Sequence, residues 1–328
     1  MTRSATSAGQ SAPAPAAQRL PVAAAILAAV CFGTTGTVHA LLPIEVGSVA
    51  FGAARIVFGG VLLVVVWAVV ARRATVTRSD SPSAARPRVT TLARPALIAA
   101  IVLGTVGVAA YQPFFFLGAE RNGVAIGTLT ALGSAPAITG LLEWAIQRRR
   151  PSARWFLATV VAAAGVAVLS GLTGGVGEVT VDGLLASVGA GASYALYTLC
   201  SKALIDHGWS PLGTMAALFG SAAVVSLPVL LATEIAWIAT VPGALAVAWL
   251  ALVNTLAGYL LFGYALGGLP ASRVATLTLF EPMTATLLGI LLLGESFGPT
   301  TVVGAALLLA GLAILVTPAR RSRRAGIR

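Results

Sequence analysis

The amino-acid sequence predicts an all-α integral membrane protein with ten transmembrane helices, arranged as a five-plus-five inverted repeat. Composition is the first observation behind this prediction: of the 328 residues, 58% are hydrophobic and only 9% are charged, and the mean hydropathy is +0.94. A water-soluble domain of this size does not have such a composition. The second observation is a series of apolar stretches of membrane-spanning length, and the third is an internal repeat.

The apolar stretches come close to the roughly 20 residues that a helix needs to cross the hydrocarbon core of a bilayer. In the first half of the chain we expect spans at 20–41, 47–71, 95–118, 124–146 and 155–172. In the second half we expect spans at 183–203, 212–233, 243–267, 273–294 and 299–317. The first span is longer than the apolar region of a secretory signal, typically about 7 to 15 residues, so we interpret it as a retained helix.

The formal net charge of +11 comes from basic residues that gather in alternate loops. Arginines cluster in the loop 72–94, in the loop 148–154 and in the tail 318–328, whereas the opposite loops carry mainly acidic residues. By the positive-inside rule, both termini are expected on the cytoplasmic side of the inner (cytoplasmic) membrane. We expect the tail 1–19 to be disordered. No basic segment is interleaved with aromatic residues, which argues against a nucleic-acid partner.

The two halves of the sequence match each other. Pro136 and Pro282 are 146 residues apart, and the same offset aligns Gly165 with Gly311 without a gap. Because each half contains five helices, an odd number, the second half must enter the membrane from the opposite side. In proteins built this way the substrate lies near the membrane midplane between the halves, and access alternates between the two sides.

The stretch TLFEPMTATLLG, at 278–289, places Glu281 directly before Pro282 inside an apolar span. A charge at the centre of a spanning helix costs about 2.5 to 3.5 kcal/mol on insertion scales, which suggests a functional role. Proline cannot donate a hydrogen bond to the carbonyl of Thr278, so we expect the helix to bend there and to free that carbonyl. We hypothesise that Glu281 exchanges a proton for a ligand or pairs with a cationic substrate. A structural hydrogen-bond acceptor is the alternative.

Polar and aromatic side chains inside the other spans complete the candidate site. Arg55 lies too deep in the second span to reach the membrane surface easily, so it should face a structural partner or an anionic group of the substrate. The other candidates for a pocket are Tyr111, Gln112, Tyr194, Tyr197, Asn254 and Tyr259. Each tyrosine could instead be an interfacial anchor, and the two amides could instead join helices.

Prolines and glycines inside the spans are candidate bends or hinges. Besides Pro282 they are Pro113, Pro136, Gly33 and Gly36. Small residues let helices approach closely and slide, and tight static packing is the alternative for both glycines.

Few residues in the chain could support catalysis or hold a metal. There is no Walker-type motif and no Gly-x-Ser-x-Gly motif, and His39 and His207 are too far apart for a metalloprotease motif, so no cofactor and no metal are expected. Glu143 lies beside an arginine cluster, where a surface ion pair would explain it. A membrane-embedded enzyme acting on a lipid-linked substrate stays as the alternative class.

The sequence LTLFEPMTATLLGILLLGESFGPTTVVGAALLLAGLAIL, which ends the second half, resembles the ten-helix EamA-like branch of the drug/metabolite transporter superfamily. AAVCFGTTG and AARIVFGG in the first two spans are also similar to that family. One departure is Arg149, which stands where family members often carry a glutamate equivalent to Glu295; we interpret it as a change in a loop.

The resemblance implies two EamA-like repeats, 20–172 and 183–317, in a secondary transporter of small metabolites or drugs, often an exporter. Its partners would be a small-molecule substrate and the lipid bilayer. Coupling to protons, a homodimer and a passive facilitator all stay open at this point.

The charge pattern predicts which loops face the cytoplasm. We expect a single cysteine at Ser81 to be protected from an impermeant maleimide in intact cells and one at Gly174 to be labelled, both in a background without Cys31 and Cys200. The reverse pattern of labelling would contradict the topology and the inverted repeat with it.

Overall fold

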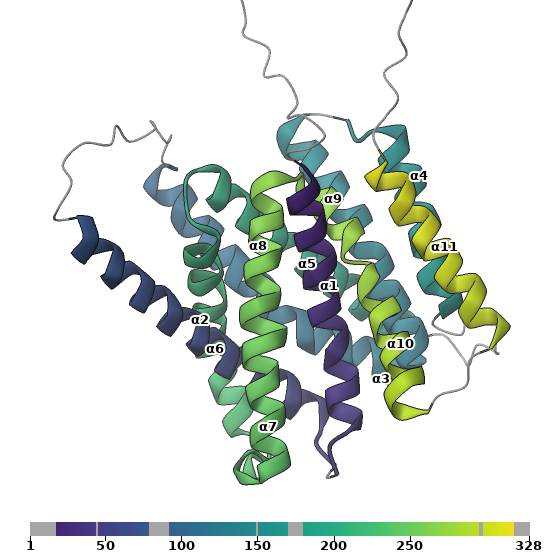
Figure 1. Cartoon of the computed structure of the whole chain (residues 1–328), viewed down its shortest axis with the longest axis horizontal. Helices are drawn as coiled ribbons and strands as arrows, with labels where there is room; N and C mark the ends of the chain where they lie inside the picture. Colours follow the sequence, from purple (N-terminus) through teal and green to yellow (C-terminus); the bar gives the residue numbers. More distant parts are fainter. Residues whose placement is uncertain are drawn as a thin grey trace, which may run out of the picture.

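The computed structural model of the chain describes residues 18–43, 45–78, 92–148, 150–169, 180–294 and 298–317, with only the backbone given for 74–78, 124, 125 and 169. This part of the chain forms a bundle of helices with no strand (Figure 1). Arg149, Glu295, Ser81, Gly174 and the terminal residues 1–17 and 318–328 are outside the described residues.

The helices of the bundle follow the expected order. The first half consists of α1 (Arg19–Ala40), α2 (Ser48–Arg78), α3 (Arg94–Gln147) and α4 (Ala153–Leu169). The second half consists of α5 (Val181–Asp206), α6 (Pro211–Leu231), the 3-10 helix η3 (Ala236–Ala239), α7 (Val241–Trp249), the π-helix η4 (Leu250–Ala257), α8 (Gly258–Gly268), α9 (Ala271–Leu277), α10 (Phe280–Leu293) and α11 (Pro299–Val316). In the described ranges, 9 helical stretches are long and apolar enough to cross a membrane, and α4 adds a shorter one. The all-α membrane fold is therefore confirmed.

The helix α3 contains two of the expected spans, because the chain turns at Gly123. Gly123 has φ 79° and ψ 153°, a conformation that is open to glycine and strained for other residues. The turn is fastened to the start of α5: the Asn122 side chain accepts a hydrogen bond from the Thr180 backbone N–H at 2.7 Å, and Arg121 pairs with Asp182 at 3.3 Å. The expected boundary between the third and fourth spans is correct to within a few residues.

The outward face of the bundle is apolar, as a lipid-facing surface must be. Leu291 is 75% exposed, Val224 72% and Leu185 66%, although each lies within a membrane-length helix. The interior is filled by small and aromatic side chains, among them Ala28, Phe219 and Phe262, all of which are fully buried. Because lipid is as apolar as this core, close packing of small residues holds such helices together.

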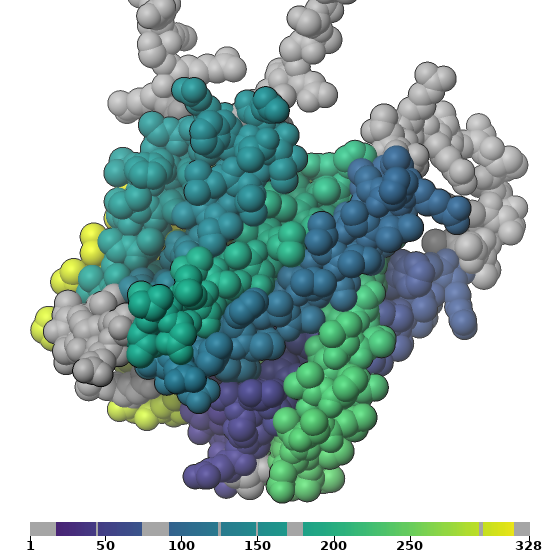
Figure 2. Space-filling view, turned by 180° about the vertical axis from the view of Figure 1, so that it is seen from behind, coloured from purple at the N-terminus to yellow at the C-terminus, as the bar shows by residue number. Residues whose placement is uncertain are grey.

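Helix pairing brings the two halves of the chain together. The helix α2 packs on α6, α4 packs on α11, and α1 packs on both α8 and α10 (Figure 1). Figure 2 shows the back of the bundle, where the first part of α3, in blue, runs obliquely beside α5, in teal green. Each half therefore supplies helices to the packing of the other.

The contact between α4 and α11 rests on two glycines. A Cβ atom on Gly165 would lie 2.4 Å from the backbone N of Leu308, and a Cβ atom on Gly311 would lie 2.6 Å from the backbone N of Ala162. The offset of 146 residues that aligns the two halves relates Gly165 to Gly311 and Ala162 to Leu308. The same glycine contact is thus made twice, with the two helices exchanging roles.

The two ends of the bundle differ in charge. The start of α1 and the end of α11 lie at one end, shown at the top of Figure 1, where Arg19, Arg154 and Arg273 are found; we call it the basic end. Glu45 and Glu234 lie at the opposite end with the turn at Gly123, and we call it the acidic end.

Candidate substrate site

The side chain of Asn254 joins three helices at the centre of the bundle. Its Nδ2 donates to the carbonyls of Cys31 and Phe32 at 3.1 and 3.3 Å and to the hydroxyl of Thr35 at 2.6 Å. Its Oδ1 accepts from Nη1 of Arg55 at 3.3 Å. Asn254 is 0% exposed, so these interhelical hydrogen bonds satisfy an amide that water does not reach. The amide therefore fixes the position of Arg55 relative to α1.

The π-helix η4 places Asn254 between α1 and α2. Its wider turn is of a kind that proteins often use at functional sites. While Asn254 bonds to α1, the next residue, Thr255, packs against α2, where a Cβ atom on Gly59 would lie 2.5 Å from the Thr255 side chain. The segment Leu250–Ala257 thus lies between α1 and α2 and contacts both helices.

Arg55 keeps donors to spare. Its Nε is buried and has no hydrogen-bond partner in the described part of the chain. No carboxylate of the described residues lies within 4.0 Å of its guanidinium. The residue is half-buried and lies roughly two helical turns from the start of α2 at Ser48. Its structural partner is therefore an amide, and part of the charged group remains available to a ligand.

The predicted span around Pro282 is interrupted between α9 and α10. Thr278 and Leu279 stay in the right-handed helical region but have ψ values of −9° and −8°, shallower than the roughly −42° of a regular α-helix, and they divide the span in two. The expectation of a free carbonyl on Thr278 is wrong. That oxygen accepts a hydrogen bond from the N–H of Glu281 at 2.9 Å, because the tighter turn brings the residue three positions ahead into reach.

Glu281 lies in the first turn of α10. Its carboxylate is half-buried and makes no hydrogen bond or ion pair within the described ranges. The groups with which it interacts electrostatically are Arg55 and the phenols of Tyr111, Tyr194 and Tyr259. Four of the other predicted residues, from α2, α3, α5 and α8, therefore lie within electrostatic range of this one carboxyl group.

Three of the candidate tyrosines lie inside the bundle. Tyr194, Tyr197 and Tyr259 are 7%, 4% and 6% exposed, so the alternative of interfacial anchors does not fit them. The hydroxyl of Tyr194 is 2.8 Å from that of Thr278, which ties α5 to the bend between α9 and α10. The rings of Tyr194 and Tyr197 meet edge to face at 5.1 Å. These phenols form one wall of the central region.

Two phenylalanines that the sequence analysis did not select complete this aromatic wall. Phe219 lies 4.0 Å from Tyr259, and Phe32 lies 4.8 Å from Tyr259, between ring centroids. The sequence could have indicated Phe32 as a site residue, since it directly precedes the candidate hinge Gly33 in the first span. Nothing in the sequence distinguishes Phe219, because an isolated phenylalanine in an apolar helix is most often part of the core.

The candidates of α3 have different surroundings. Gln112 packs against α2, where a Cβ atom on Gly52 would lie 3.2 Å from its amide. Pro113 is exposed on the outside of the bundle, so the structure does not bring it to the centre. Pro136 is buried, and α3 continues past both prolines as an α-helix. Tyr111 stacks on Phe115 with 5.9 Å between the ring centroids.

The two glycines of α1 are not equivalent. A Cβ atom on Gly33 would lie 2.6 Å from Cβ of Thr284 and 2.7 Å from the carbonyl oxygen of Glu281. A Cβ atom on Gly36 would have nothing within 4 Å. Only Gly33 therefore allows the close contact between α1 and α10, and it does so at the residue that carries the central carboxylate.

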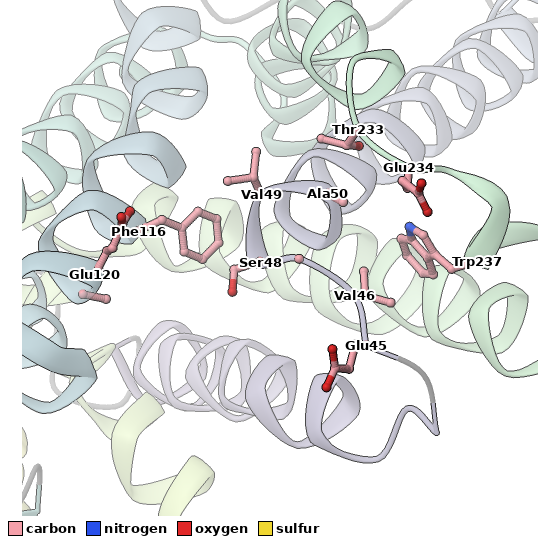
Figure 3. A pocket seen from close by; sticks show the side chains of 12 residues that line it. Glu45, Val46, Ser48, Val49, Ala50, Phe116, Glu120, Thr233, Glu234 and Trp237 are labelled. Carbon is pink, nitrogen blue, oxygen red and sulfur yellow. The ribbon is translucent and has the colours of Figure 1, made fainter.

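A pocket of about 590 Å³ opens at the acidic end of the bundle. Figure 3 shows Glu45, Glu120 and Glu234 around it, with the rings of Phe116 and Trp237 between them. None of the predicted site residues is among those that line it. Phe116, which lines the pocket, is one helical turn from Gln112 on α3.

Glu143 does not form the surface ion pair that we expected. It is 8% exposed and accepts hydrogen bonds from the backbone N–H groups of Ala271 and Ser272 at 2.8 and 3.1 Å and from the Ser272 hydroxyl at 2.5 Å. The first N–H groups of a helix lack partners within the helix, and a carboxylate satisfies them well. Glu143 therefore caps α9 and links it to α3.

Comparison with known proteins gives a consistent picture. Residues 19–171 and 182–317 match the model of the EamA-like transporter family. The chain is 38% identical over 301 residues to the "Uncharacterized transporter YwfM" of Bacillus subtilis, covering 92% of this chain and 95% of that protein. It is 27% identical over 253 residues to a "Probable amino-acid metabolite efflux pump" of Salmonella typhimurium, covering 74% of this chain and 84% of that protein.

A solved structure supports the fold alone. A chain described as "Crystal structure of protein" superposes with a TM-score of 0.71 at 17% identity, covering 93% of this chain and 99% of that chain.

The geometry of α1 predicts that substitutions at its two glycines have different effects. Gly33→Ala should lower the melting temperature of the purified protein by several degrees, because the added methyl group forces α1 away from α10 at a cost of about 1 to 3 kcal/mol. Gly36→Ala has the same effect on helix propensity but meets open space, so it should leave the melting temperature unchanged or raise it slightly. Equal melting temperatures for the two variants would contradict the assigned contact.

Proposed function

Because the chain belongs to the EamA-like transporter family, we propose that it is a secondary active transporter that exports a small metabolite by alternating access. The observation that carries this proposal is the pair of opposite charges at the centre of the bundle. Arg55 and Glu281 are each half-buried, and neither forms an ion pair within 4.0 Å in the described part of the chain. Two such charges that do not neutralise each other in an apolar bundle are suited to a ligand that carries both complementary groups.

The surroundings of the two charges favour a zwitterion of the amino-acid type. The free donors of Arg55 suit a carboxylate, and the carboxylate of Glu281 suits an ammonium group. The aromatic wall that includes Tyr194 and Tyr259 would pack against the apolar part of such a molecule. The name of the Salmonella typhimurium relative supports the same class of substrate and the direction of export.

Two halves that form an inverted repeat would provide the alternating access. The reciprocal glycine contacts of α4 and α11 support this architecture, since one offset relates both contacts. The assignment of 20–172 and 183–317 to the two repeats belongs to the proposal. The bend between α9 and α10 adds a point at which one helix of the second repeat can move without breaking an intact turn.

We place the protein in the cytoplasmic membrane with its basic end in the cytoplasm. The arginines of that end support this orientation through the positive-inside rule. The acidic pocket would then open outward, where a released substrate leaves. A passive facilitator only equilibrates its substrate across the membrane and cannot accumulate it against a concentration gradient. Measuring accumulation of the substrate in sealed vesicles therefore distinguishes a facilitator from an active transporter.

The substrate class can be tested first by ligand-induced stabilisation. A ligand that binds only the folded state raises both the free energy of unfolding and the melting temperature. At a ligand concentration of a hundred times its dissociation constant, the gain in free energy is about 2.7 kcal/mol. A panel of amino acids, nucleosides, amines and common drugs should show a shift for amino acids or their derivatives. A shift confined to nucleosides or to uncharged drugs would contradict the zwitterion.

Glu281→Gln tests whether the carboxyl group couples transport to protons. The variant keeps the shape of the side chain but cannot ionise, so we expect it to lose accumulation driven by a pH gradient in proteoliposomes while retaining exchange of substrate. Loss of substrate binding would instead indicate direct recognition of the ammonium group. If a folded Gln variant accumulates substrate like the parent, Glu281 has no part in the mechanism.

Arg55 should recognise the anionic group of the substrate through its planar fork. Arg55→Lys keeps the charge but loses that geometry, so we expect transport to fall by about tenfold, in line with the loss of one hydrogen bond between charged groups. Arg55→Ala should reduce it further. Parent-like transport by both variants, measured on protein that is monodisperse in detergent, would show that the arginine is only a tolerated charge.

A further inference from the structure

A second cavity, of about 810 Å³, lies at the basic end of the bundle and is separate from the central site. It is formed by the start of α1, the end of α3, the start of α4, the start of α9 and the end of α11. None of the residues assigned to the central site lines it. What distinguishes it is its content of four arginines, Arg19, Arg150, Arg154 and Arg273.

Two of these arginines are held in place by the last turn of α11. Nε of Arg154 donates to the carbonyl of Ile314 at 2.5 Å, and Nη2 of Arg273 donates to the carbonyl of Leu315 at 3.2 Å. The last carbonyls of a helix lack partners within the helix and carry its negative end, so they hold the two cations close together. The two guanidinium groups act on each other electrostatically.

The other two arginines have no such restraint. Arg19 and Arg150 are exposed and make no hydrogen bond or ion pair with the rest of the described chain. Nε of Arg273 is buried and also lacks a partner there. The cavity thus offers two fixed guanidinium groups and two that can close over a ligand.

No carboxylate is free to neutralise this charge. The only acidic residue that lines the cavity in the described ranges is Glu143, and both of its oxygens are engaged at the start of α9. The segments that adjoin the cavity in sequence, 1–17 and 318–328, contain no aspartate or glutamate. Among the described residues of the lining, one carboxylate therefore stands against four guanidinium groups, and the cavity keeps a net positive charge.

Two tryptophans, Trp144 and Trp155, line the cavity. Trp144 is 40% exposed, and Trp155 donates from Nε1 to the carbonyl of Ser272 at 3.3 Å. Tryptophan is enriched where a membrane meets water, and basic pockets between helices at that level bind anionic headgroups. Arginine is also the side chain best matched to the oxygens of a phosphate.

We propose that this cavity is a binding site for a phosphate-bearing anion, supplied by an anionic phospholipid headgroup or by a free phosphate compound. Arg154 and Arg273 form its fixed base, and Arg19 and Arg150 close over the bound group. The site joins α1, α4, α9 and α11 at the basic end, so an occupant would bind these four helices together. The proposal does not depend on the substrate of the central site.

The test compares two charge-matched pairs of substitutions. Arg19→Gln with Arg150→Gln removes two arginines from the cavity that make no structural contacts, so the fold should persist. Arg94→Gln with Arg148→Gln removes two exposed arginines that do not line the cavity. Parent and variants are delipidated in detergent and examined by native mass spectrometry with phosphatidylglycerol or phosphatidylcholine, and by thermal unfolding with inorganic phosphate.

The parent should retain phosphatidylglycerol in preference to phosphatidylcholine, and the cavity pair should bind it about tenfold more weakly, since each basic residue near an anionic headgroup contributes on the order of 1 kcal/mol. The control pair should bind like the parent. A rise in melting temperature with inorganic phosphate, lost only in the cavity pair, would support a free anion as the occupant.

Three outcomes would overturn the proposal. The first is a parent that shows neither a lipid preference nor a response to phosphate. The second is equal weakening in the control pair, which would assign the effect to general surface charge. The third is unchanged binding in the cavity pair.

Discussion

The amide of Asn254 is the interaction on which the centre of the bundle depends. It connects the backbone of α1 to the guanidinium of Arg55 in α2, from a fully buried position in η4. Inside a membrane a polar group cannot form hydrogen bonds with water, so its hydrogen-bond partner must come from the protein itself. The carbonyls, the amide and the cation therefore fix each other's positions, and the charge of Arg55 is held at a defined place among the aromatic side chains.

Around this centre, glycine residues allow pairs of helices to pack at close distance. Gly33 brings α1 onto the carbonyl of Glu281, and Gly165 and Gly311 bring α4 and α11 together. In lipid there is no hydrophobic driving force between helices, so van der Waals packing at such close contacts stabilises their association. The bend between α9 and α10 lies next to the Gly33 contact, so any movement of α10 would change the packing of α1 and the surroundings of the Glu281 carboxylate at the same time.

The charge asymmetry of the chain has two structural consequences, one at each end of the bundle. At the acidic end, Glu45, Glu120 and Glu234 surround a pocket with an aromatic lining. At the basic end, arginines that would otherwise be counted only as topology signals converge on one cavity, where the end of α11 holds two of them. Residues that orient a membrane protein can therefore also form binding surfaces, because the positive-inside rule concentrates them where headgroup phosphates lie.

The membrane fold and the approximate positions of the spanning helices could be predicted from the sequence, because hydropathy acts along the chain. The sequence also selected Arg55 and Glu281, since a charge within an apolar span is visible without a structure. Tertiary structure alone decided that Glu143 caps α9 rather than pairing at the surface, and that Gly33 touches α10 while Gly36 does not. The physical reason is that lipid and core are both apolar, so hydropathy leaves the rotation of each helix about its axis undetermined. That rotation is set by contacts with distant helices, which no local pattern records.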